Sequence, residues 1–127
     1  MQEDKFKKWV REAIESLPVV LRKKLYNVEI TVEDSPRGEI HKNKPLPYII
    51  LGLYQGVPLN KRGVFHTHFF PDRITIFCQQ IEKLCASEEE MRELVIKTTL
   101  HEIGHYFGFN ERELREMEIT RLRGGNK

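Results

Sequence analysis

The sequence predicts a small α+β domain in which helices pack on a sheet of three or four strands. Two observations carry this prediction. Apolar residues recur at helical spacing near both ends of the chain, and three short segments between them have the apolar character of strands. The predicted order is helix, strand, strand, strand, helix, helix, which is typical of a small sheet covered by helices. A length of 127 residues fits a single domain, residues 1–127.

The N-terminal segment is predicted to be an amphipathic helix over residues 4–17, because its apolar residues recur at helical spacing with Lys and Glu between them. Pro18 stops this helix, since proline lacks the backbone N–H that continuation requires. A second, short helix is expected around residues 19–26. The apolar residues of the first helix are Phe6, Trp9, Val10, Ala13, Ile14 and Leu17.

Three segments are predicted to be strands. Residues 28–33 alternate between apolar and polar, which favours a strand with one buried face. Residues 48–54 form a nearly continuous apolar run, which is typical of a strand buried on both faces. Residues 72–78 form the third strand. The segments between them, 34–47 and 59–71, are expected to be loops or irregular.

A second long helix is predicted to run from Ser87 to about Phe107. Ser87 is a favourable N-cap and Glu90 completes a capping box, while the acidic first turn suits the helix dipole. Gly108 can end this helix in the left-handed conformation. Asn110 then caps a further helix.

The segment from His101 to His105 has the pattern H-E-x-x-H and lies on this predicted helix. Residues four apart lie on one helix face, so both imidazoles can reach one metal ion. Glu102 is displaced about 100° around the helix, where it can reach a metal-bound water instead of the ion. We therefore predict a Zn2+ site in which His101 and His105 are ligands and Glu102 is the catalytic base. The competing interpretation is a pair of surface histidines on a charged helix.

Helical geometry also assigns the two sides of this helix. The stripe expected to face the core consists of Ile96, Leu100, Ile103 and Phe107. The stripe expected to face a cleft consists of Leu94, Thr98, His101 and His105.

Glu111 is the best candidate for the third metal ligand. Gly108 lets the chain reverse and bring Glu111 back to the metal, and a carboxylate beside two imidazoles is an accepted catalytic zinc set. Glu111 also lies in the first turn of a helix, where acidic residues are favoured without any metal. Glu113 is expected to be the capping-box partner of Asn110. His66 and His68 remain alternative ligands if they lie on a strand.

Composition excludes several other classes of function. A net charge of +2 is too small to indicate nucleic-acid or membrane binding. No apolar run reaches the length of about 18 residues that suggests a membrane span. No secretory signal is recognisable, so a cytoplasmic location is expected. Cys78 and Cys85 are too few for a disulfide framework and are expected to be reduced thiols.

Several segments together resemble the minimal zincin-like family, small bacterial proteins assigned as metallopeptidases with a metzincin-like motif. The segments are Gly52–Leu59, Pro71–Ile76 and His101–Glu111, in the same order as in that family. The family pattern is H-E-x-x-H-x-x-G-x-x-D, and Glu111 stands at the position of the final aspartate. The resemblance implies a zincin-like α+β fold with a small sheet against the H-E-x-x-H helix. A working zinc peptidase with this site is expected to act on a peptide or an unfolded protein.

The resemblance also suggests how a substrate is held. In larger zincins an edge strand above the motif helix binds the peptide by strand addition, and residues 49–54 or 73–78 are candidates here. Tyr54 is either an oxyanion-stabilising residue or a packing residue, and packing is favoured. No methionine turn is expected, because Met117 lies on a predicted helix.

Two alternatives to a working zinc peptidase remain at this point. One is a metal-binding protein with little intrinsic activity, which needs an activating partner to complete its cleft. The other is a metal-dependent endoribonuclease, since one bacterial family of such enzymes has the spacing H-x-x-x-H-x-x-G-x-x-H. The glutamates at 102 and 111 depart from that pattern.

Overall fold

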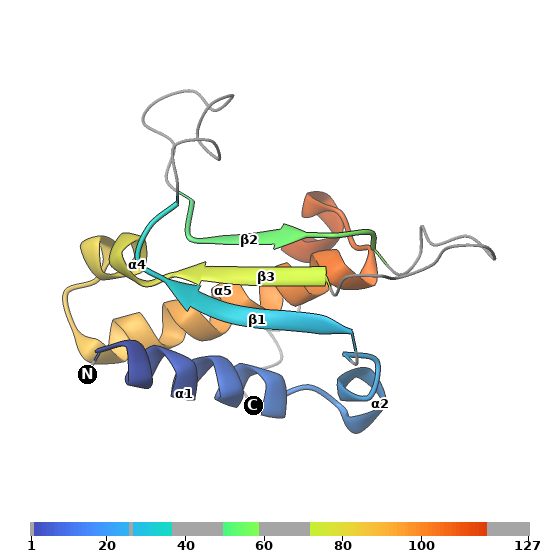
Figure 1. Ribbon diagram of the computed structural model, residues 1–127, viewed down its shortest axis with the longest axis horizontal. Helices are drawn as coiled ribbons and strands as arrows, with labels where there is room; N and C mark the ends of the chain where they lie inside the picture. Colours follow the sequence, from blue (N-terminus) through green and yellow to red (C-terminus); the bar gives the residue numbers. More distant parts are fainter. Residues whose placement is uncertain (1, 26, 37–49, 59–71, 117–127) are drawn as a thin grey trace.

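The computed structural model describes residues 2–25, 27–36, 50–58 and 72–116 (Figure 1). A helical segment at residues 111–116, called the return helix below, follows the last long helix. The preceding elements are α1 (Gln2–Glu15), α2 (Val19–Arg22), β1 (Val28–Glu33), β2 (Gly52–Gln55), β3 (Asp72–Phe77), α4 (Cys78–Leu84) and α5 (Glu88–Phe107). This arrangement confirms the predicted α+β class.

Within these residues the sheet has three strands in the order β1-β3-β2. The central strand β3 runs parallel to β1 and antiparallel to β2. Ile74 of β3 lies opposite Ile30 on one side and Tyr54 on the other. Figure 1 shows α5 crossing behind the sheet and α1 lying beside α5 below β1. Helix α5, which carries the H-E-x-x-H motif, therefore packs directly against the strands.

The hydrophobic core lies between the sheet and the helices. Trp9 of α1, Ile74 of β3 and Tyr106 of α5 are all at most 5% exposed. Burial of such large apolar side chains is the main favourable term in folding. The buried core cluster consists of Phe6, Trp9, Val10, Ile74, Ile76, Cys78, Ile81, Val95, Ile103 and Tyr106.

The first helix ends earlier than predicted. α1 stops at Glu15, and the Ser16 hydroxyl donates to the Ala13 carbonyl at 2.6 Å. This side-chain bond competes with continued helical bonding, as serine hydroxyls commonly do. Pro18 then precedes α2, as expected.

The strand predicted over residues 48–54 differs most from its prediction. β2 begins at Gly52, and Tyr48 and Ile49 lie outside the described residues. Burial on both faces is wrong for β2, because it is an edge strand of the described sheet and its residues are half-buried or exposed. The buried central strand is β3, although its sequence is more polar.

Helix α4 was not predicted. The third strand was expected to reach Cys78, but Cys78 begins α4, and Phe77 at its N-cap makes no side-chain capping bond. Without a capping residue, a helix of seven residues leaves no recognisable start in the sequence. Cys78 and Cys85 are both free thiols, as expected.

Candidate metal centre

Helix α5 carries the H-E-x-x-H motif, and its start is fixed by capping. The Ser87 hydroxyl accepts a hydrogen bond from the Glu90 N–H at 3.2 Å. The Glu90 carboxylate accepts from the Ala86 N–H at 2.9 Å, one residue before the position that a standard capping box would use. Three glutamates in the first turn also favour this end of the helix dipole.

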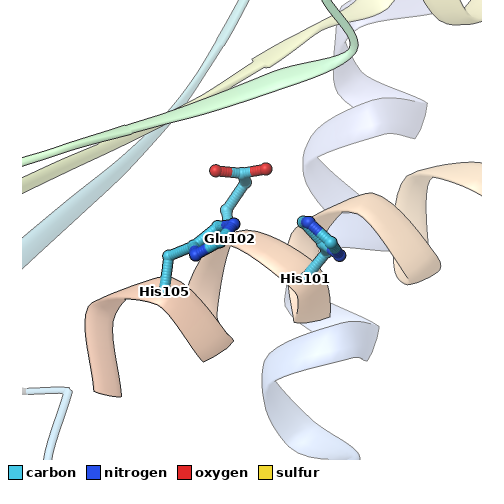
Figure 2. A group of neighbouring side chains, drawn as sticks. All are labelled: His101, Glu102 and His105. Atoms are coloured by element: carbon cyan, nitrogen blue, oxygen red, sulfur yellow. The ribbon is translucent and has the colours of Figure 1, made fainter. Parts of the chain in front are cut away.

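The two motif histidines lie one turn apart on the same side of α5 (Figure 2). Their ring centroids are 4.9 Å apart, with the ring planes at 83°. The side chains of His101 and His105 are 31% and 25% exposed, so both remain accessible from solvent. Ligand atoms of His101, Glu102 and His105 all lie within 4.8 Å of one another.

Glu102 occupies a different environment from the histidines. It is 8% exposed, and Figure 2 shows its side chain extending from α5 toward the strands. Its carboxylate accepts a hydrogen bond from the backbone N–H of Tyr54 on β2. Burial raises the pKa of Glu102, although the positive charges of His105 and His101 and the Tyr54 N–H oppose that rise.

β2 approaches α5 so closely at Gly52 that a side chain would not fit. A Cβ at Gly52 would stand 2.8 Å from the Thr98 Cγ2 atom and 3.1 Å from the Glu102 Cγ atom. The absence of a side chain thus permits the strand to reach the carboxylate.

The side chain of Tyr54 makes contacts of its own, apart from the backbone N–H that donates to Glu102. Its hydroxyl donates to the Asp72 carboxylate at 2.6 Å, and its ring packs edge-on against Tyr106. Asp72 is itself only 4% exposed. These contacts favour the packing role that was predicted for Tyr54.

A Schellman turn reverses the chain after α5. Gly108 adopts the left-handed conformation with φ of 102°, as predicted. The Phe109 N–H donates to the Gly104 carbonyl at 3.0 Å, and the Gly108 N–H donates to the His105 carbonyl at 2.9 Å. The turn therefore fixes the direction in which the chain leaves the motif.

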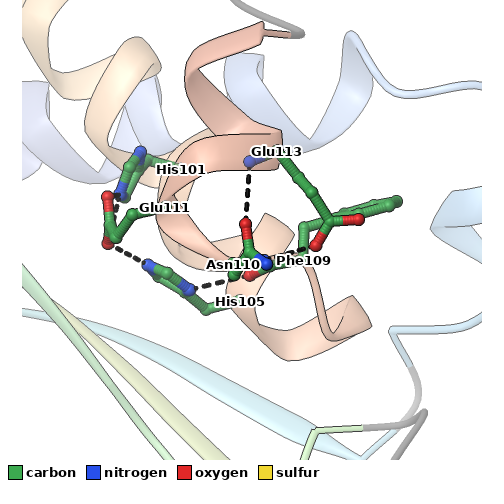
Figure 3. Close-up of polar contacts among 6 residues, drawn as sticks. All are labelled: His101, His105, Phe109, Asn110, Glu111 and Glu113. Carbon is green, nitrogen blue, oxygen red and sulfur yellow. Dashed lines mark hydrogen bonds and ion pairs between the residues drawn. The ribbon is translucent and has the colours of Figure 1, made fainter.

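A reciprocal capping box then starts the return helix. The Asn110 side chain accepts from the Glu113 N–H at 2.8 Å, and the Glu113 carboxylate accepts from the Asn110 N–H at 2.9 Å (Figure 3). This confirms the predicted capping role of Glu113.

The return helix brings Glu111 to the two imidazoles. Its Oε1 atom lies 2.7 Å from His105 Nε2 and 3.1 Å from His101 Nε2. Figure 3 shows the carboxylate facing both rings. Burial is the largest single influence on the pKa of Glu111 and raises it. Hydrogen bonds and charge from His101 and His105 together outweigh burial and hold that pKa below its usual value.

The contacts of His105 are compatible with either a proton or a metal ion between its Nε2 atom and Glu111. His105 Nδ1 lies 3.1 Å from the Phe109 carbonyl oxygen, which can only accept, so Nδ1 carries the proton. In the neutral ring, Nε2 then presents a lone pair to the Glu111 carboxylate. Two acceptors at 2.7 Å require a proton or a metal ion between them. Two imidazoles and one carboxylate suit zinc, so the residues present fit this metal.

The predicted sides of α5 are partly wrong. Ile103 of the expected core stripe is buried and Phe107 packs against the core, but Leu100 is only half-buried. All three line an apolar pocket of about 310 Å³, which His101 also lines. Thr98 of the expected cleft stripe is buried against β2. The reason is that the sheet and α1 cover two different sides of α5, whereas a two-sided helical projection assumes one buried face.

Four residues that shape the site were missed by sequence reasoning, and the two alternative ligand candidates cannot be placed. The missed residues are Gly52, Asp72, Gly104 and Leu114. The unusual glycine inside a helix at position 104 was the one available signal among them. His66, His68 and Met117 lie outside the described residues.

None of the helices in the described part of the chain has the length and apolar character of a membrane-spanning segment.

The comparison with known families agrees with the geometry of the site. No curated protein sequence gives a significant match. A family model described as zincin-like metallopeptidase matches residues 25–121, which is more than half of the chain and includes the H-E-x-x-H helix. The chain therefore belongs to the zincin-like metallopeptidase family.

Proposed function

We propose that this protein is a zinc metallopeptidase that hydrolyses peptide bonds in peptides or unfolded proteins. The observation that carries the proposal is the convergence of Glu111 on His101 and His105, with Glu102 buried beside them. Family membership supports both the metal and the reaction class.

In this proposal His101, His105 and Glu111 hold the zinc ion. His105 is oriented by its Nδ1–H bond to the Phe109 carbonyl, which leaves Nε2 free to bind metal. Zinc, when bound, lowers the pKa of a coordinated water and polarises the substrate carbonyl.

Glu102 is the general base in this proposal. Its carboxylate takes a proton from the attacking water and delivers it to the leaving amine nitrogen. The Tyr54 N–H holds the carboxylate in place from the sheet side. Burial raises the pKa of Glu102, and a raised pKa makes a carboxylate a better acceptor of the proton.

The edge of β2 that does not pair with β3 is the proposed binding strand for an extended peptide. β2 pairs with β3 on one side only among the described residues, and it lies against α5 next to Glu102. A peptide added antiparallel or parallel to β2 would place its carbonyl groups near the Glu102 carboxylate.

The metal part of the proposal is tested by the zinc content of purified protein, measured by elemental mass spectrometry. The native chain, Glu111→Ala, His105→Ala and Glu102→Gln are compared. We expect about one zinc per native chain, the same content in Glu102→Gln, and sharply lower contents in the other two variants. Native protein that stays metal-free after zinc is added would rule out the proposal.

The reaction is tested on a mixed peptide library whose products are identified by mass spectrometry. We expect cleavage by native protein and none by Glu102→Gln, which should still bind zinc. Equal cleavage by both would show that Glu102 is not the base or that the activity is a contaminant.

A second candidate function is a metal-binding protein that gains activity only with a partner. The openness of the site favours it, since the Glu111 side chain is 64% exposed and both imidazoles are accessible. Full zinc content without cleavage of any library peptide would favour this alternative.

A further inference from the structure

Gly104 lies inside α5, between the two motif histidines, and it is buried. Glycine is among the least favourable residues in a helix interior, so its presence here needs a reason. The hydrogen bonds of the turn do not supply one, because they use backbone atoms that any residue possesses.

The space beside Gly104 is occupied by Leu114 of the return helix. A Cβ built on Gly104 would overlap the Leu114 Cδ2 atom and lie 3.4 Å from its Cγ atom. Leu114 is 7% exposed, whereas the other residues of the return helix are exposed. Leu114 is therefore the buried anchor that docks the described part of this helix on α5.

Leu114 and Glu111 are three positions apart, so they lie on the same side of the return helix. When Leu114 sits on Gly104, Glu111 is turned toward the imidazoles one turn away on α5. The capping box and the Schellman turn fix where the helix starts. The leucine fixes how the helix is rotated about its axis.

We propose that Gly104 and Leu114 are positioning residues for the metal ligand Glu111, acting through their mutual contact. This inference rests on the ligand set of the proposed function. It adds that the affinity for zinc depends on the close approach of α5 and the return helix at Gly104, a residue that does not bind the metal.

The test measures zinc affinity by competition with a chelator, together with the absorption spectrum of the cobalt(II)-substituted protein. Leu114→Ala and Gly104→Ala should each weaken zinc binding by about 10- to 100-fold, as losses of supporting contacts to ligands typically do. Both should also change the cobalt spectrum toward that of Glu111→Ala. A purely structural role would lower thermal stability without changing the spectrum.

The double variant G104A/L114A separates the contact from general damage. The alanine methyl group at 104 would occupy space that the shortened side chain at 114 has vacated. The double variant should therefore bind zinc more tightly than Gly104→Ala alone. Leu21→Ala is the matched control, because Leu21 lines the same apolar pocket as Leu114 from α2. It should leave the cobalt spectrum unchanged.

The variant Glu111→Ala distinguishes the two ways in which this inference can fail. Weak zinc binding by Glu111→Ala with native affinity in Leu114→Ala and Gly104→Ala would overturn the positioning role alone. Native affinity in Glu111→Ala would overturn the ligand set itself. If Leu114→Ala does not fold, Gly104→Ala still gives the answer, because it keeps the leucine.

Discussion

The two glutamates beside the imidazoles belong to regions built in different ways. Glu102 faces the sheet, is 8% exposed and accepts the N–H of Tyr54 from a strand distant in sequence. Glu111 faces solvent on the return helix, and its side chain is 64% exposed. Burial raises the pKa of the first, while bonds to His101 and His105 lower the pKa of the second. In the proposed mechanism these opposite environments suit the carboxyl group of Glu102 to proton transfer and that of Glu111 to binding a cation.

The largest expected effect comes from replacing the carboxylates of Glu102 and Glu111 one at a time. Glu102→Gln should lower kcat/KM by about 10²–10⁴-fold and leave zinc content unchanged, because the base is lost and the ligands remain. Glu111→Gln should lower zinc affinity first and lose activity only as the metal is lost. Excess zinc should then restore activity to Glu111→Gln but not to Glu102→Gln. Restoration of both variants would mean that the two carboxylates do not differ in role.

Gly52→Ala should strain the contact between β2 and α5 and leave the return helix unaffected. The new Cβ would meet Thr98 and Glu102, so we expect a loss of about 1–3 kcal/mol in the free energy of unfolding, measured by urea denaturation. Activity should fall with it, since β2 moves away from the carboxylate, while the zinc affinity per folded molecule should persist. A variant as stable as the native protein would show that the strand and helix are not tightly packed here.

Tyr54→Phe separates the hydroxyl of this residue from its backbone. The hydroxyl donates to buried Asp72, so its loss should cost about 1–2 kcal/mol of stability by thermal or urea unfolding. The backbone N–H that holds Glu102 remains, so kcat should stay close to the native value. A large fall in kcat at unchanged stability would instead indicate that the hydroxyl stabilises the oxyanion.

Asn110→Ala should weaken the return helix and leave the sheet side intact. Loss of this cap should cost about 0.5–2 kcal/mol of local stability. Zinc affinity should fall, and hydrogen exchange should accelerate in residues 111–116 but not in β2. Asn110→Asp is the matched control, because aspartate caps helices as well as asparagine does. Unchanged exchange in Asn110→Ala would show that other contacts hold the helix.

The smallest expected effect is an opposite pH dependence of stability in the metal-free protein. The raised pKa of Glu102 means that its charged form destabilises the fold above the folded pKa and that this cost disappears as pH falls toward the unfolded value. The lowered pKa of Glu111 stabilises the fold above the unfolded value, and this is lost as pH falls through the folded pKa. Thermal midpoints should therefore rise in Glu102→Gln and fall slightly in Glu111→Gln at about pH 7, and both differences should shrink at about pH 4. Shifts of the same sign would contradict the comparison.

The sequence was sufficient for local features of the fold and the site. Ser87, Gly108, Asn110 and Glu113 have the capping and turn roles that their residue types predict, because these roles depend on neighbours only a few positions away. The motif spacing likewise places His101 on the same side of α5 as His105.

Features that depend on distant contacts were not predictable in the same way. The apolar run before Gly52 suggested a central strand, but strand order is set by how the whole sheet is connected. The contacts of Gly52 with Glu102 and of Gly104 with Leu114 depend on how elements approach in space, which no local pattern encodes. The metal ligand roles and the catalytic role remain predictions.

The Schellman turn at Gly108 has a consequence for how the chain folds. It folds Glu111, six residues after His105, back toward the motif, so the three proposed ligands come from one contiguous stretch. Closing so short a loop costs little chain entropy. If zinc binds here as proposed, its binding would favour the helical turn that holds these three residues, without a contribution from the strands. Placement of Glu102 against β2 requires the sheet, so the proposed base depends on long-range contacts whereas the proposed ligands depend on local ones.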